Sequence, residues 1–111
     1  MPINWSDFEK IDMRVGTILE VNDFPKARKA AYQLLIDFGK EMGIKKSSAQ
    51  ITVNYKKEDL LNRQVIAVVN FPPKQIADFI SECLVLGVYD ENNDVVLLNP
   101  DRKIANGCKV G

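Results

Sequence analysis

Residues 64–87 read QVIAVVNFPPKQIADFISECLVLG, two apolar runs on either side of a proline pair. The run at 65–69 is too short for a typical helix and is rich in β-branched residues, so it predicts a buried strand. Pro72 and Pro73 end this strand, because proline cannot donate to a sheet and Pro72 holds Phe71 extended. The second run, 84–88, predicts another strand. We therefore expect residues 71–82 to form a loop between two strands.

The rest of the chain predicts further strands and two short helices. A loose alternation of apolar residues predicts a strand at 13–24. Further strands are expected at 32–38, 44–51 and 65–70, from 81 or 84 to 89, and at 95–98. Gly16, inside the first strand, is typical of a bulge or sharp bend. Ser6 and Glu9 fit a capping box for a helix at 7–10. Residues 53–62 have a helical pattern.

This order of elements predicts an all-β fold. Three meandering strands, a helix and two more strands are the order of a five-stranded Greek-key OB barrel, here with short flanking helices. The competing architecture is an open α+β sandwich. A length of 111 residues suits one domain, so we expect residues 1–111 to form a single OB-fold domain with a short N-terminal helix and a C-terminal β extension.

Composition excludes several classes of function. The chain has no histidine, which removes Ser-His-Asp and Cys-His chemistry, and we expect a protein that is not an enzyme and uses no cofactor or metal. Cys83 and Cys108 do not have the spacing of a metal site and are expected to be reduced thiols. No long apolar segment or secretory signal is present, so we expect no membrane span and a cytoplasmic location.

Charge is unevenly distributed although the formal net charge is zero. Residues 24–57 contain eight basic and two acidic residues, and both flanking segments are acidic. OB folds bind oligonucleotides on strands 2 and 3 and on the 1–2 and 4–5 loops, which this basic third largely covers. Phosphate contacts are then expected from Lys26, Arg28, Lys29, Lys45, Lys46 and Lys74. Tyr32, Tyr55, Phe71 and Phe79 could stack bases; the alternatives are a solvated charged face and aromatic packing.

Four strings of sequence resemble a known family. DMRVGTI at 12–18, KSSAQIT at 46–52, VIAVVNFPP at 65–73 and SECLVLG at 81–87 are similar to the CsaA-type proteins of the tRNA-binding domain family. The resemblance covers nearly the whole chain. It implies an OB fold, a homodimer without catalytic activity, and two roles, structure-specific tRNA binding and chaperone activity linked to protein export.

The resemblance also implies site residues. The CsaA-type proteins that this chain resembles share Gly16, Ser48, Asn70, Lys74 and Ser81. On this resemblance, Ser48, Asn70 and Ser81 join the six basic residues of the expected tRNA surface. Relatives often have glycine at the position of Asp78. An aspartate tolerates left-handed backbone there but brings a negative charge, which weakens the case for phosphate binding.

The chaperone hypothesis needs an apolar surface for unfolded or pre-export polypeptide. The candidates are Phe71, Pro72, Pro73, Ile76 and Phe79, which could equally be dimer contacts. We expect the dimer interface to use the N-terminal helix and the strand near the C-terminus, through Trp5, Phe8, Ile11, Val95, Leu97 and Ile104. The zero net charge and Asp78 favour the chaperone role over tRNA binding.

Overall fold

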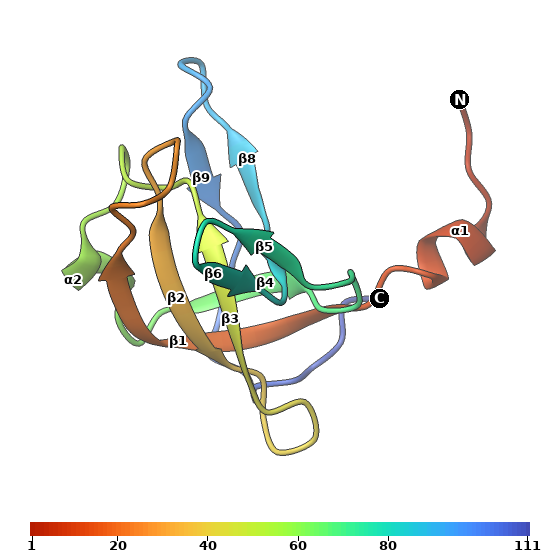
Figure 1. The fold of residues 1–111 in the computed structure, drawn as a ribbon. Helices are drawn as coiled ribbons and strands as arrows, with labels where there is room; N and C mark the ends of the chain where they lie inside the picture. Colours follow the sequence, from red (N-terminus) through yellow and green to blue (C-terminus); the bar gives the residue numbers. More distant parts are fainter.

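The computed structural model describes residues 1–111, and its body is a five-stranded antiparallel sheet that curls into a barrel (Figure 1). The strand order is β3-β2-β1-β4-β7, with bounds β1 Met13–Asp23, β2 Tyr32–Asp37, β3 Ile44–Ala49, β4 Gln64–Val68 and β7 Leu84–Val85. The barrel nearly closes where the Glu82 N–H donates to the Lys46 carbonyl at 2.7 Å. The predicted all-β OB fold is confirmed.

The core follows the two-residue period of the strands. In β2, Tyr32, Leu34 and Ile36 are buried and the residues between them are half-buried. Gly16 pairs regularly with Val65, so the bulge expected there is wrong; the register shift lies between Ile18 and Glu20. A Cβ on Gly16 would meet Ile36 at 2.6 Å, so the glycine instead allows β2 to pack closely.

Two hairpins lie outside the main sheet and differ from the sequence prediction. The expected 71–82 loop contains β5 Lys74–Ile76 and β6 Phe79–Ser81, which lie in front of β3 in Figure 1. The expected continuous fifth strand divides into β7 and β8 Gly87–Tyr89, and β8 pairs with β9 Val95–Leu97. The division occurs at Leu86, whose N–H bonds Ile66 while its carbonyl accepts from Leu98. The strand therefore changes partners there.

Both helices are short and differ from the expected bounds. Helix α1 spans Trp5–Glu9 with Asn4, not Ser6, as N-cap; the Asp7 carboxylate accepts from the Asn4 N–H at 3.2 Å. The cap predicted at Ser6 is therefore wrong; asparagine is as good an N-cap as serine. Helix α2 covers only Lys57–Leu60, because Leu60 alone reaches the core. Helix α1 buries no residue and projects from the barrel (Figure 1). No helix is long and apolar enough to cross a membrane.

The C-terminal segment returns along the barrel to the start of β1 (Figure 1). The Arg14 guanidinium donates to the Gly107 carbonyl at 3.0 Å and to the Asp12 carboxylate at 2.6 Å. This pairing raises the pKa of Arg14, chiefly through the hydrogen bond to Asp12. Residues 98–111 are thus bonded to the same barrel wall that β1 and β4 form.

Candidate functional site

An apolar groove of about 820 Å³ opens between the end of β3 and the two outer hairpins. Twelve of its 22 lining residues are hydrophobic, and we call this hollow the apolar groove. Phe71 (54% exposed), Leu84 (47%) and Tyr89 (76%) present large apolar side chains to solvent at this groove. Large apolar side chains gathered around one hollow are typical of a surface that contacts a partner.

Residues of both predicted binding sets line this one groove. Phe71, Pro72 and Ile76 come from the expected polypeptide set, and Ser48, Lys74 and Ser81 come from the expected tRNA set. Pro73 is exposed but does not line the groove. The two sets meet because the β5–β6 hairpin folds back over β3, which β6 contacts. The open loop expected at 71–82 did not predict this contact.

Phe79 is a packing residue rather than a wall of the groove. Its ring lies 5.4 Å from the buried ring of Phe24, and the Lys46 ammonium lies 5.4 Å from its centroid. The contact with Phe24 joins the β5–β6 hairpin to the loop between β1 and β2. Phe79 thus holds the hairpin in place.

Two polar residues of the expected tRNA set are engaged within the chain. Ser81 Oγ accepts from the Ser48 backbone N–H at 3.1 Å and donates to the Cys83 carbonyl at 3.3 Å. The Asn70 side chain accepts from the Asp12 N–H and donates to the Lys10 carbonyl. Both groups therefore fix the backbone, Ser81 at the barrel seam and Asn70 at the entry to β1.

The six basic residues expected to contact phosphate lie on three neighbouring elements. Lys26, Arg28 and Lys29 are exposed in the β1–β2 loop, Lys45 and Lys46 are half-buried on β3, and Lys74 is exposed at the start of β5. We call these six residues the basic cluster. The Lys26 ammonium already forms an ion pair with Asp78 at 3.1 Å.

The two tyrosines considered for base stacking are both engaged within the chain. Tyr32 is buried in the core and its hydroxyl donates to the Tyr55 carbonyl at 2.8 Å. Tyr55 Oη accepts from the Leu97 N–H at 2.9 Å, and the Arg63 guanidinium lies over its ring at 5.2 Å. The sequence analysis missed Tyr89, whose only signal is an aromatic residue at the end of a strand.

The turn that carries Tyr89 is fixed by Asp90. The Asp90 carboxylate accepts from the backbone N–H groups of Asp94 (3.0 Å) and Asn92 (2.9 Å) and from the Asn54 side chain (3.2 Å). These bonds, the one from Asp94 first, hold the pKa of Asp90 below its usual range because they favour the charged form. The β8–β9 hairpin thereby forms a fixed wall of the groove.

Cys83 lines the inner end of the groove. Its side chain is buried, and burial raises the pKa of the thiol to about 12. A thiol that stays protonated at neutral pH is a poor nucleophile. Cys83 therefore acts as a small apolar packing residue.

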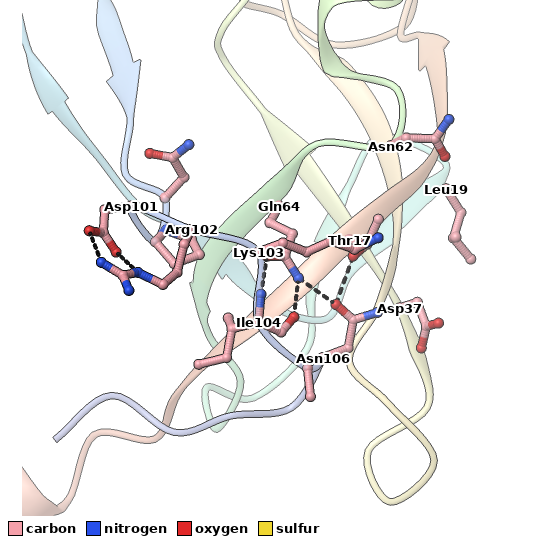
Figure 2. Close-up of a pocket in the computed structure, with 13 residues that line it drawn as sticks. Thr17, Leu19, Asp37, Asn62, Gln64, Asp101, Arg102, Lys103, Ile104 and Asn106 are labelled. Carbon is pink, nitrogen blue, oxygen red and sulfur yellow. Dashed lines mark hydrogen bonds and ion pairs between the residues drawn. The ribbon is translucent and has the colours of Figure 1, made fainter.

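A second hollow, a polar cleft of about 760 Å³, lies beneath the C-terminal segment (Figure 2). Gln64 Nε2 donates to the Ile104 carbonyl at 2.6 Å and its Oε1 accepts from the Ile104 N–H at 3.1 Å. Thr17 Oγ1 donates to Asn106 Oδ1 at 2.7 Å. These bonds hold the C-terminal segment against β1 and β4, and the segment itself forms one wall of the cleft.

The residues expected at a dimer interface separate into two groups. Trp5 is 65% exposed and packs against Phe8 with 5.2 Å between ring centroids; Ile11 and Ile104 are also exposed. Leu97 is buried in the core and Val95 packs against it, so neither is free for an interface. Because successive side chains on a strand point to opposite faces, Val96 is exposed between Val95 and Leu97 on β9, and its exposed partner on β8 is Val88.

The chain belongs to the tRNA-binding domain family. The model of that family, described as a putative tRNA binding domain, matches residues 13–109. The relation to CsaA-type proteins that the motifs indicate is confirmed by two crystal structures. CsaA chaperone protein from Picrophilus torridus is 57% identical with a TM-score of 0.93, covering 99% of this chain and 100% of that one. Chaperone CsaA from Bacillus anthracis is 50% identical with a TM-score of 0.94, and each chain is fully covered.

Curated relatives include much longer proteins. Methionine–tRNA ligase from Pyrococcus horikoshii is 40% identical over 108 residues, which is 97% of this chain. The chain spans only 14% of the length of that relative. The similarity therefore concerns one domain of the ligase.

Proposed function

We propose that this protein is a non-enzymatic, homodimeric CsaA-like chaperone of the cytoplasm that binds unfolded, export-bound polypeptide in the apolar groove. The observation that supports this best is the groove itself, with Phe71, Leu84 and Tyr89 exposed around it. Burying one such side chain against a client contributes roughly 1.5–3 kcal/mol. Contacts of this kind depend on apolar area rather than on a particular sequence, which suits varied clients.

The groove assignment is tested by the aggregation of a chemically denatured client protein. We expect Phe71→Ala and Tyr89→Ala to reduce suppression of aggregation several-fold, because each removes exposed apolar area from the groove. Leu61→Ala is the matched control, since Leu61 is 50% exposed but does not line the groove. Full suppression by the Phe71→Ala, Tyr89→Ala double variant would refute the assignment.

A second candidate function is structure-specific tRNA binding through the basic cluster. Family membership supports it, and so does the position of Lys74, which lines the groove. Lysine and arginine would contact phosphates and read the shape of the RNA rather than its sequence. Ser48 lines the groove and would contribute a hydroxyl, whereas Asn70 and Ser81 would act by fixing the backbone.

The tRNA function is tested by titrating total tRNA at several salt concentrations. Because each neutralised phosphate releases a counterion, the affinity should fall steeply as salt increases. Arg28→Ala should weaken binding, whereas Lys103→Ala, which lies at the polar cleft, should not. An affinity that does not change with salt, or none at low salt, would rule this function out. Displacement of tRNA by an unfolded polypeptide would show that both ligands use one surface.

The homodimer is proposed to form through Trp5, Phe8, Ile11 and Ile104, with Val88 and Val96 replacing Val95 and Leu97. Helix α1 has no buried residue within the monomer, and a five-residue helix is not stable alone in water. A second copy of the chain would cover its apolar side chains. A dimer would also present two grooves, so one long polypeptide could bind both with a gain in avidity.

A further inference from the structure

We propose that Asp78 is a specificity-determining residue that disfavours RNA by occupying Lys26 as an internal counterion. The inference rests on the tRNA-binding function proposed for the basic cluster. In this proposal the β5–β6 turn lowers RNA affinity and leaves polypeptide binding unchanged.

The ion pair joins two segments that are far apart in the sequence. Lys26 lies in the β1–β2 loop and Asp78 in the β5–β6 turn, and the ammonium and carboxylate are 3.1 Å apart. The same two segments are joined by a ring contact between Phe24 and Phe79, with 5.4 Å between the ring centroids. Because Phe24 is buried, the turn is held against the loop by packing as well as by charge. Asp78 is therefore kept close to Lys26.

The Asp78 carboxylate competes with RNA phosphates for the Lys26 ammonium. A carboxylate offers lysine the same anionic oxygens as a phosphate, and Asp78 is the only acidic residue of the hairpin at 74–81. Lys26 and Asp78 are 69% and 58% exposed, so a phosphate that approaches Lys26 from solvent meets the Asp78 carboxylate as a competitor.

The position of Asp78 lets its charge affect RNA binding without affecting polypeptide binding. It does not line the apolar groove, and Phe71, Leu84 and Tyr89 do not depend on its charge. Removing the charge should therefore strengthen binding of a polyanion only. A mainly uncharged unfolded segment would bind as before.

The experiment compares Asp78→Asn with Asp101→Asn in tRNA titrations between about 50 and 200 mM salt. Asp101 is the matched control, because it is also an exposed aspartate paired with a basic residue, Arg102 at 3.2 Å, but lies in the C-terminal segment. We expect Asp78→Asn to bind tRNA about fivefold more tightly at low salt. Its slope of log affinity against log salt should steepen by about 0.7–0.9, the equivalent of one further phosphate contact. Asp101→Asn should change affinity less than about twofold.

A Lys26→Ala background tests whether Asp78 acts through Lys26. There the gain from Asp78→Asn should fall to about that of Asp101→Asn. If wild type binds tRNA and the two asparagine variants behave alike, the inference fails and the tRNA function stands. An equal gain in the Lys26→Ala background also overturns the inference, since the effect would then be one of net charge.

No tRNA binding by wild type or Asp78→Asn at low salt would overturn both the inference and the tRNA function. Unchanged suppression of client aggregation by Asp78→Asn is the expected result for the groove, and a loss of suppression would contradict its selective action.

Discussion

The Asn70 side chain bonds Asp12 directly: Asn70 Oδ1 accepts from the Asp12 backbone N–H at 3.0 Å, although the two residues are 58 positions apart. Asn70 Nδ2 donates to the Lys10 carbonyl at 2.7 Å. One side chain at the end of β4 therefore fixes both ends of the link between α1 and β1. The direction in which α1 leaves the barrel depends on this asparagine.

Asn70→Ala should lower the free energy of unfolding by about 1–2 kcal/mol, because it leaves two backbone groups without their partners. Chemical denaturation of the purified protein measures this. Asn99→Ala is the control, since Asn99 is exposed and its side chain makes no hydrogen bond, and its effect should stay within about 0.5 kcal/mol. Equal stability of the two variants would contradict the role assigned to Asn70.

Trp5→Ala should weaken the proposed dimer at least tenfold without lowering barrel stability, because Trp5 is exposed in the monomer and large aromatic residues dominate interfaces. Light scattering over a range of protein concentrations gives the dissociation constant. Leu61→Ala should dimerise like wild type. A wild-type protein that is monomeric at micromolar concentration would refute the dimer itself.

Ala77→Gly should stabilise the protein by about 0.5–1 kcal/mol. Ala77 has a φ of +53°, a left-handed conformation that costs a residue with a Cβ about 1 kcal/mol and costs glycine little. Asp78, where relatives often have glycine, does not adopt a positive φ. Asn93→Gly is the matched control: Asn93 also has positive φ, at +62°, but asparagine tolerates it, so thermal unfolding should change less. No difference between the two variants would show that Ala77 is not strained.

Stability should decline at alkaline pH because of Cys83. The pKa of this thiol is about 12 in the folded protein and about 8.5 in an unfolded chain. A pKa that is higher when folded contributes stability below the unfolded value, and this stability is lost as pH rises from about 8.5 toward 12. Between about pH 8 and pH 10 we expect a loss on the order of 2 kcal/mol from this group. Cys83→Ala should lack this loss, as urea unfolding at the two pH values would show.

Thiol labelling provides a separate check on the same residue. A thiol reagent at neutral pH should modify Cys108, which is partly exposed, and leave buried Cys83 unmodified until the protein is denatured. Cys108→Ala should then show almost no labelling while folded. Rapid modification of Cys83 in the folded protein would mean that its burial is not maintained in solution.

The strands of the barrel could be predicted because each buries one face. The alternation at 32–38 and the apolar run at 65–69 identified β2 and β4 to within two residues, and the motifs identified the family. Local pattern failed for the capping of α1, where the Ser6–Glu9 motif pointed two residues beyond the actual N-cap, Asn4. It also could not reveal the β5–β6 hairpin, since three-residue strands leave little periodicity to detect.

The barrel, the family and the charged and apolar residues available for a binding surface can all be read from the sequence. Which of these residues meet depends on the three-dimensional fold. It brought Phe71 and Lys74 to one groove, turned Leu97 inward, and used Asn70 and Ser81 for backbone bonds. It also paired Lys26 with Asp78. The physical reason is that burial patterns and turn residues are local properties of a chain, whereas the partner of a side chain depends on segments that the fold brings together.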